Sequence, residues 1–408
     1  MKVLITVVGQ RTEHWTDLFG LLAEQPDLDL TLLLADISPG TEVTLRRYSE
    51  QFAGFRYQVL PHRLSEARSG HMASILFAPG ALRSQVGVRP DVIHIIGEAA
   101  YLSTAQVVSW RNRYWPSVPL TLYAAQNIVT RFPLPFPWFE RRAYNAVDHA
   151  FPITPGALQV LRQKGYRGAA EIVPLGVDTS RFAPPERPPA PHPFTIGFVG
   201  RLEPHKGVAH LLQAVERLDA DLLAVGRGSL TPMVQQLAER RPGRVRLLEW
   251  ADHEHLPGLM HQMDVLVLPS TPVVQRNVVP WVGIPLREQF GRVLVEAMAC
   301  GVPVIGSDLG EIAHVVGAGG LTFPAGNVDA LTAALQQVRD DDALASRLSQ
   351  NGAARAVSEF DWTRSIRLMR TVWEQLTGSL AAPAAQRVQQ LCRAAGCRPA
   401  PGHEVSKP

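Results

Sequence analysis

The chain has 408 residues, which is more than a single hydrophobic core usually organises, so two domains are expected. Apolar residues make up 46% and charged residues 19% of the chain, a composition that excludes extensive disorder. The formal net charge of +3 is too small to indicate a nucleic-acid-binding protein. The apolar run at residues 3–8 is too short for a signal peptide or a membrane span, so a cytoplasmic protein is expected. Three cysteines lack metal-ligand spacing and are predicted to be reduced thiols: Cys300, Cys392 and Cys397.

Along the first half, short runs rich in Val, Ile and Leu alternate with longer helical patterns. This alternation is typical of βαβ units and of a parallel sheet. We predict strands at residues 3–8, 30–34, 91–96, 120–124, 149–153 and, late in this half, 172–174. The following segment 183–193, APPERPPAPHP, is rich in proline and can continue neither a helix nor a central strand. We predict that it links two domains.

Beyond the linker the same alternation restarts and predicts a second parallel sheet. Its strands are expected at residues 194–199, 220–225, 245–248, 265–268 and 302–306. An amphipathic helix at about 361–378 is expected to cross back and pack on the first domain. The predicted organisation is a first domain at 1–182, a second domain at 194–360 and a frayed tail at 379–408.

The loop after strand 194–199 carries two cations. It reads Gly200-Arg201-Leu202-Glu203-Pro204-His205-Lys206-Gly207 and is followed by a helix from about Val208. Backbone N–H groups and the positive end of a helix dipole favour an anion at such a turn. Arg201 and Lys206 can hold a diphosphate there and stabilise its charge as it leaves. The alternative is that both are solvated loop cations.

Two carboxylates flank the start of a short predicted helix. The helical pattern begins near Gly291, and Gly301 and Pro303 mark its end. Amides at the start of a helix lack partners within the helix and can bind hydroxyls or phosphate oxygens. Glu288 and Glu296 can accept hydrogen bonds from vicinal hydroxyls, one from a sugar and the other from a ribose. The alternative is one solvated and one helix-face glutamate.

With these motifs in order, the sequence becomes recognisable. The Glu-x7-Glu pair Glu288 and Glu296 lies in EQFGRVLVEAMACGVPVIGSD, and together with FVGRLEPHKG it resembles family 4 of the retaining glycosyltransferases. The resemblance is close over residues 196–326 and only general in the first half. It implies an α/β protein of the GT-B fold, in which two Rossmann-like domains face each other across a cleft.

The resemblance also implies an activity and its machinery. Similar enzymes move a hexosyl unit from a nucleoside-diphosphate sugar to a hydroxyl acceptor, which is a glycan, a lipid or a small molecule. They retain the anomeric configuration, usually without a metal, and no cofactor is expected. By this resemblance the catalytic residues are Arg201, Lys206 and Glu288, with the first two on the donor diphosphate beside Gly200 and Glu288 on the donor sugar.

Further donor contacts follow from the same resemblance. Backbone amides of Phe290 and Gly291 are expected to assist Glu288. Glu296 is expected to hold the nucleotide ribose, with Val293 and the region 248–251 flanking ribose and base.

The first domain departs from the family pattern in two places. Many relatives have a Gly-Gly turn after the first strand, whereas this chain has Gly9 followed by Gln10. Many also have a histidine near the donor sugar, where this chain has Gln126, which can donate a hydrogen bond but cannot act as an acid or base. We still expect Gly9 and Gln126 at the donor site. The insertion-like stretch 271–287 has the character of a specificity loop.

Some clusters resemble metal sites only superficially. The run 340–342, Asp-Asp-Asp, precedes a helical pattern and is predicted to cap that helix. His253, His255 and His261 are predicted to lie in a solvated loop and on an amphipathic helix. No metal site is therefore expected.

Other first-domain residues are placed near the carboxyl ends of strands, where doubly wound sheets bind ligands. His94 is expected to pack in the core rather than contact an acceptor. For Glu98, and for His14 and Trp15 after the first strand, an acceptor contact and plain packing both stay open.

An aromatic, proline-rich segment at residues 131–142 contains Trp138 and ends in Arg141 and Arg142. One interpretation is contact with a membrane surface, which would suit a lipid-linked acceptor and a peripheral location at the inner face of a membrane. A buried loop lid is the interpretation that we favour.

Rival functions share parts of this pattern. An inverting enzyme or an epimerase of the same fold has no reason to keep both Glu288 and Glu296. A catalytically silent sugar-nucleotide-binding protein, acting as a partner or sensor, is the alternative from another class. A dinucleotide oxidoreductase is disfavoured because no GxGxxG motif follows the first strand. The oligomeric state is left open.

Overall fold

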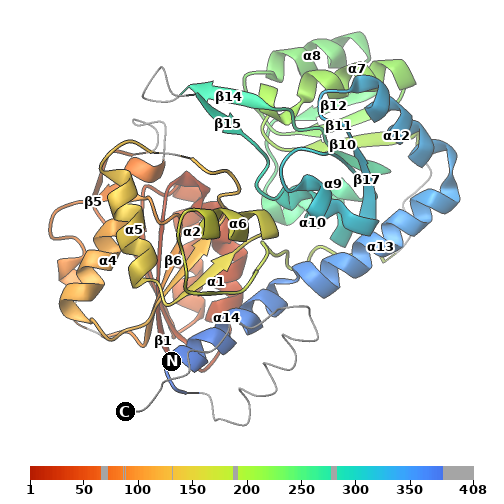
Figure 1. Ribbon diagram of the computed structural model, residues 1–408. Helices are drawn as coiled ribbons and strands as arrows, with labels where there is room; N and C mark the ends of the chain where they lie inside the picture. The colour runs from red at the N-terminus through yellow and green to blue at the C-terminus, as the bar shows by residue number, and fades with distance from the viewer. Residues whose placement is uncertain are drawn as a thin grey trace, which may run out of the picture.

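A computed structural model describes residues 1–65, 72–85, 87, 89–130, 132–186, 192–276 and 283–379. The described chain forms two parallel sheets, each with helices on both faces (Figure 1). The α/β class and the pair of Rossmann-like domains expected from the sequence are confirmed.

The first sheet has the strand order β3-β2-β1-β6-β7-β8-β9, and all its pairs are parallel. Its central strands are mainly apolar, with Ile5 of β1 opposite Leu32 of β2 and Val7 opposite Ile96 of β6. The order changes direction between β1 and β6, which is where sheets of this kind bind ligands. The strands are β1 Lys2–Val8, β2 Asp29–Ala35, β3 Phe55–Val59, β6 Val92–Ile96, β7 Leu120–Ala124, β8 His149–Pro152 and β9 Ala169–Ala170.

Two predictions for this sheet were wrong. Residues 172–174 form no strand, because the last pairing is made earlier by β9. The edge strand β3, FRYQV, was missed because most of its side chains face solvent and it lacks an apolar run.

Helices cover both faces of the first sheet. The segment after β1 is a 3-10 helix, η1 Gln10–Trp15, which continues into α1 Thr16–Ala23. Side-chain caps begin two of the others: Ser38 accepts from the N–H of Thr41, and Thr154 from that of Ala157. The remaining elements are α2 Pro39–Gln51, α4 Leu102–Tyr114, α5 Phe136–Ala146, α6 Pro155–Gln163, the 3-10 turns η2 Met72–Ser74 and η3 Arg83–Gln85, and a small hairpin of β4 His62–Arg63 and β5 Leu76–Phe77.

The second sheet has the order β12-β11-β10-β13-β16-β17. Its strands are β10 Thr195–Val199, β11 Asp221–Val225, β12 Val245–Leu248, β13 Val265–Leu268, β16 Val304–Ser307 and β17 Gly320–Phe323. The edge strand β17 was not foreseen. Its helices are η4 Pro204–Lys206, α7 Val208–Leu218, α8 Thr231–Arg240, η5 His253–His255, α9 Leu256–Met260, α10 Arg292–Ala299, α11 Ile312–Val316, η6 Gly317–Gly319, α12 Val328–Asp340 and α13 Asp342–Phe360.

The insertion-like stretch 271–287 contains a two-stranded antiparallel hairpin. Strand β14 Val273–Arg276 pairs with β15 Gly283–Leu286, with Val273 opposite Leu286. The hairpin extends away from the second sheet (Figure 1). A role in specificity stays a prediction.

The chain returns to the first domain at its far end. Helix α13 packs on α10, and the next helix, α14 Trp362–Leu376, packs on α1 (Figure 1). At the crossing Val177 pairs with Asp361, and the N–H of Val177 donates to Phe360 O at 2.8 Å. The described part of the linker, 183–186 and 192–193, is neither helix nor strand. The predicted domain limits stay predictions, and the predicted tail beyond 379 lies outside the described residues.

Candidate functional site

The cationic loop of the second domain is formed by a tight approach of two strand ends. Gly200 follows β10 with a φ of 149°, and Gly226 follows β11 with a φ of 134°. A Cβ at Gly226 would lie 2.0 Å from Gly200 O, so only glycine fits there. Arg201 is exposed, and its Nη2 lies 3.4 Å from Nε2 of His205. Arg201 therefore projects from a rigid turn and forms no ion pair with the described residues.

Lys206 and Glu288 are brought together as a half-buried ion pair. Lys206 Nζ donates to Glu288 Oε2 at 2.6 Å, and Ser270 Oγ donates to the same oxygen at 3.1 Å. Burial alone would raise the pKa of Glu288, but the charge and hydrogen bond of Lys206 and the bond from Ser270 hold it below its usual value. Glu288 is therefore an anion that accepts hydrogen bonds.

The backbone of Glu288 is held from two sides. Asn127 Nδ2, on the loop after β7, donates to Glu288 O at 2.8 Å across the domain interface. Gly310 has a φ of 68°, and a Cβ there would lie 2.2 Å from Glu288 O. The loop that carries Glu288 is thus fixed by a first-domain amide and by a glycine that no side chain can replace without a shift.

The Gln126 loop meets the Glu288 loop directly. Gln289 Nε2 donates to Gln126 Oε1 at 3.1 Å. The Gln126 loop is itself fixed by Glu98, whose Oε1 accepts from the N–H of Ala125 at 2.8 Å and of Gln126 at 2.9 Å. Burial raises the pKa of Glu98 to about 7 despite these bonds. Glu98 therefore supports the loop, which favours a packing role.

The start of α10 is built as the sequence suggests. Gly291 adopts the left-handed conformation at the N-cap, with a φ of 78°. The side chain of Phe290 is buried and meets Phe360 edge-on at 5.6 Å, whereas Val293 is partly exposed. Amides of the first helical turn have no partner within the helix and point out of its start. Phe290 can therefore contribute its amide to a ligand but not its side chain.

Glu296 lies one and a half turns further along α10 and is almost completely buried. Its Oε1 forms an ion pair with Arg292, whose Nε lies 2.9 Å away, and contacts Nε2 of His253, also at 2.9 Å. Burial opposes its charge, but Arg292 and His253 outweigh burial and lower the pKa of Glu296 to about 2. His253 was not foreseen as a site residue. Its position before α9, far along the chain from Glu296, gives no signal in the sequence.

Gly9 lies apart from these residues. It has a φ of 96°, and its N–H donates to Ala35 O at 2.9 Å. No hydrogen bond among the described residues joins it to the Glu288 or Glu296 clusters. The nearest link is Arg292 Nη1, which donates to His14 O at 2.7 Å in the 3-10 helix after Gly9. The donor contact expected for Gly9 stays a prediction.

The structure decides between the alternative interpretations of the acidic run and of three histidines. Asp341 caps α13 by accepting from the N–H of Leu344 at 2.8 Å, as predicted for the acidic run. His94 is fully buried, and its Nδ1 lies 2.8 Å from Oγ1 of Thr121, which confirms core packing. His255 is solvated, but for His253 that interpretation was wrong.

No group of metal-ligand side chains occurs in the described ranges. Within the same ranges, no helix has both the length and the apolar character needed to cross a membrane. The free thiol of Cys300 is buried, and burial raises its pKa to about 12. The other two cysteines lie outside the described residues.

The aromatic segment, described from residue 132 to 142, runs into the first turns of α5 and is largely exposed, so the favoured interpretation of a buried lid was wrong. Leu134 is 84% and Trp138 52% exposed. The guanidinium of Arg142 stacks on the Trp138 ring at 4.6 Å. Arg131 lies outside the described residues.

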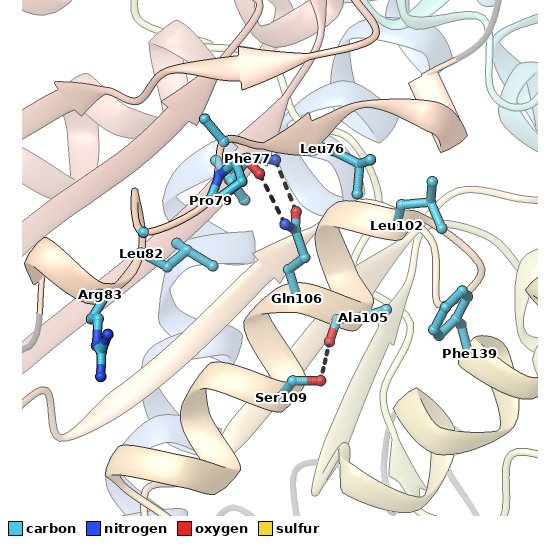
Figure 2. A pocket seen from close by; sticks show the side chains of 12 residues that line it. Leu76, Phe77, Pro79, Leu82, Arg83, Leu102, Ala105, Gln106, Ser109 and Phe139 are labelled. Carbon is cyan, nitrogen blue, oxygen red and sulfur yellow. Dashed lines mark hydrogen bonds between the residues drawn. The ribbon is translucent and has the colours of Figure 1, made fainter.

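Beside this segment lies an apolar groove of about 400 Å³ in the first domain (Figure 2). Its polar groups are already bonded: Gln106 pairs with the N–H and C=O of Phe77 at 2.8 and 2.9 Å, and Ser109 Oγ donates to Ala105 O. Exposed Arg83 lies at one end and Phe139 of α5 at the other (Figure 2). The groove therefore offers mainly apolar surface.

The donor-side geometry agrees with a family match. Residues 181–355 match the model described as "Glycosyl transferases group 1". The similarity to group 1 glycosyl transferases therefore covers residues 181–355 of the 408 residues. The candidate site residues from Gly200 to Glu296 all lie within this matched segment.

Curated relatives match over about half of this chain. Glycogen synthase of Mycobacterium tuberculosis is 32% identical over 206 residues, which is 48% of this chain and 46% of that protein. Phosphatidyl-myo-inositol mannosyltransferase of Mycolicibacterium smegmatis is 33% identical over 218 residues, or 51% and 52%. The match thus spans about half the length of these relatives.

Solved structures extend the likeness to both domains. Sucrose-phosphate synthase from Thermosynechococcus elongatus superposes with a TM-score of 0.70 at 19% identity, covering 93% of this chain and all of that one. HepE from Anabaena, solved in complex with UDP, also has a TM-score of 0.70, at 18% identity and 92% and 99% coverage. These likenesses show the fold of the chain, which is GT-B, across both domains.

Proposed function

We propose that this protein is a retaining glycosyltransferase that moves a hexosyl unit from a nucleoside-diphosphate sugar to a hydroxyl acceptor, without a metal ion. The observation that carries the proposal is the cluster of Lys206, Glu288 and Ser270 beside the Arg201 turn. It combines a cation suited to a diphosphate with a buried carboxylate suited to sugar hydroxyls. HepE, with the same fold, was solved with UDP, which supports a nucleoside-diphosphate ligand.

The geometry suits a leaving diphosphate. Arg201 and Lys206, with the amides at the start of α10, neutralise the charge that grows on the diphosphate, the role that a divalent ion has in other enzymes. The acceptor hydroxyl attacks the face that the diphosphate leaves, and a diphosphate oxygen takes its proton. No protein nucleophile is then required, and Glu288 orients the sugar.

Replacing Glu288 tests the assignment. We expect Glu288→Ala to lower turnover at least 100-fold, because a hydrogen bond that positions the sugar is lost, while nucleoside diphosphate still binds. Labelled donors measure turnover, and calorimetry with UDP, GDP and ADP measures binding. Glu239→Ala, an exposed glutamate on α8, is the control. Unchanged turnover in Glu288→Ala would contradict the proposal.

The same assays separate the alternatives. A catalytically silent binder would bind a sugar nucleotide without turnover in the wild type. NMR of the product reports the anomer, and inversion would exclude the retaining mechanism. A chelator is expected to leave the rate unchanged.

We further propose that the first domain contacts a membrane through the segment around Leu134 and Trp138. Both apolar side chains are exposed, Arg141 and Arg142 add positive charge, and the groove between β5 and α4 has room for an apolar chain. One relative is named for a lipid, phosphatidyl-myo-inositol, which supports a lipid acceptor. A cytoplasmic location, peripheral to the inner face of a membrane, belongs to the same proposal.

Vesicle binding tests the membrane contact. We expect the protein to sediment with phosphatidylglycerol vesicles more than with phosphatidylcholine vesicles, and Trp138→Ala to weaken that binding several-fold. Trp250→Ala removes an equally large ring, 67% exposed in the second domain, and is the matched control. Equal loss in both variants, or no vesicle binding by the wild type, would remove this part of the proposal.

A further inference from the structure

The carboxylate of Glu296 is held through one oxygen and left open at the other. Oε1 meets two nitrogens, Nε of Arg292 and Nε2 of His253, each at 2.9 Å. Among the described residues no donor bonds to Oε2. A carboxylate fixed in this way presents one free oxygen in a set direction, as recognition of a diol requires.

The contacts of His253 define its tautomer. A carboxylate oxygen only accepts, so the contact of Nε2 with Glu296 requires a proton on Nε2. Nδ1 then accepts from Arg181 Nη2 at 3.0 Å. Arg292 Nη2 also lies 3.1 Å from Nε2 of His253. Nε2 cannot accept a hydrogen bond while it donates one to Glu296, and we assign the proton from the contact with Glu296 because it is the shorter of the two.

His253 is itself held in place by groups outside its own helix. The same Arg181 Nη2 donates to Oδ2 of Asp17, on α1 of the first domain, at 2.8 Å. Asp17 Oδ2 lies 3.6 Å from Nδ1 of His253, and the ring of Phe182 lies 5.1 Å from the imidazole. The imidazole is 29% exposed, so it is anchored at the edge of the site rather than in the core.

We infer that His253 is a positioning residue for the nucleotide ribose. Its Nε2–H fixes Oε1 of Glu296, so that Oε2 is aimed at the ribose hydroxyls of a nucleoside diphosphate. The inference rests on the proposed function, since it assigns a further residue to the same donor site. It also joins the ribose contact to the first domain through Arg181 and Asp17.

The physical consequence is a loss of donor affinity without a loss of chemistry. Removing one donor to a buried carboxylate lets it turn or draw in water, which weakens its bond to a ligand about tenfold. The ribose is remote from the bond that breaks. The effect therefore belongs in the donor KM and in nucleotide affinity rather than in kcat.

Three variants and one ligand analogue test this. His253→Leu keeps apolar bulk but has no donor, His253→Gln restores an N–H donor, and His255→Leu changes the 76% exposed histidine of the same 3-10 helix. The probe is the one of UDP, GDP and ADP that binds the wild type most tightly, together with its 2′,3′-dideoxy form. Calorimetry measures affinity, and initial rates give kcat and KM.

We expect His253→Leu to weaken nucleoside diphosphate binding and to raise the donor KM about tenfold, with kcat within twofold of the wild type. His253→Gln is expected to recover most of the affinity, and His255→Leu to match the wild type. The dideoxy ligand lacks the hydroxyls that Glu296 would hold, so it should bind the wild type and His253→Leu equally.

The inference is overturned if His253→Leu binds the nucleoside diphosphate as tightly as the wild type, if kcat falls instead, or if the penalty persists with the dideoxy ligand. Failure of the proposed function is distinguishable, because the wild type itself would then bind none of the three nucleotides, or would bind one of them without turnover.

Discussion

Lys206 and Glu288 form an ion pair with each other, so a ligand that binds either side chain must compete with this pair. The ion pair is only partly exposed, 18% at Lys206 and 14% at Glu288. Breaking one half of a buried pair leaves the other charge uncompensated. A donor that draws Lys206 toward its diphosphate must therefore offer Glu288 hydroxyl donors in exchange, which favours a ligand that carries both groups.

This exchange predicts the behaviour of Lys206→Met. Without Lys206 burial dominates at Glu288, so we expect its pKa to rise above the ordinary value. We expect kcat/KM to fall 100-fold or more, with the acidic limb of its pH profile moved to higher pH. Lys206→Arg, which keeps the charge, is the control. A pH profile with an unmoved acidic limb would contradict the ion-pair account.

Glu98 is expected to make the stability of the protein depend on pH. Burial raises its folded pKa to about 7 from 4.5, so the folded protein binds the proton more tightly than the unfolded chain does. Its contribution to stability is present below about pH 4.5 and is lost as the pH rises toward 7. Glutamine does not ionise, so we expect Glu98→Gln to avoid this loss of unfolding free energy, which amounts to up to ~3 kcal/mol.

Urea unfolding at several pH values measures the effect. The stability of Glu98→Gln relative to the wild type should grow between pH 4.5 and 7 and then level off. Glu239→Gln should show no such trend. A difference independent of pH would mean that the carboxyl of Glu98 has the same pKa in the folded and the unfolded protein.

At the scale of elements, the site is held by short connections between strands and helices, and Gly310 is the clearest case. Its φ of 68° and the 2.2 Å approach of a Cβ to Glu288 O leave no room for alanine. We expect Gly310→Ala to displace the Glu288 loop and to cost about 2 kcal/mol or more, with a loss of turnover. Gly326→Ala has a similar φ, 79°, but open space, and should cost only about 1 kcal/mol and leave turnover unchanged. Thermal unfolding and rate assays decide between the two.

The same scale explains how far the sequence could be interpreted. Buried strands such as β6 and β13 are almost wholly apolar, so they were predictable. The edge strands β3 and β17 expose part of their side chains and lack such a run. The hairpin β14–β15 is antiparallel within an α/β domain, so the βαβ rhythm gave no reason to expect it.

At the candidate site, motifs within one loop or helix could be predicted from the sequence. Contacts between distant segments could not. The Glu-x7-Glu spacing of Glu288 and Glu296 lies within one loop and the helix that follows it, so it can be recognised in the sequence. The bond from Asn127 to Glu288 and the contact of His253 with Glu296 join residues 161 and 43 positions apart. Such contacts depend on the packing of whole domains, which no local pattern encodes.

At the scale of the molecule, α14 makes the first domain depend on the end of the chain. Trp373 of α14 is fully buried, and its ring lies 5.3 Å from that of His94 in the first sheet. We expect Trp373→Ala to destabilise the protein by about 3–5 kcal/mol, because it leaves a large cavity in the core. Trp138→Ala, at an exposed site, should cost far less. Urea unfolding followed by circular dichroism compares the two, and equal costs would contradict the packing described for α14.

The chain passes between the domains twice, once after Val177 and once at Asp361, and these two segments are paired with each other. Two covalent connections side by side form a hinge between the domains. They allow one domain to rotate relative to the other about a line near the paired segments, and they prevent the domains from separating there. The far rim, where the β14–β15 hairpin lies, must then sweep through the largest arc (Figure 1). Under the proposed function, access for a bulky acceptor is set by how far that rim swings, while His253 at the proposed ribose contact lies against Arg181, close to the crossing, and moves little.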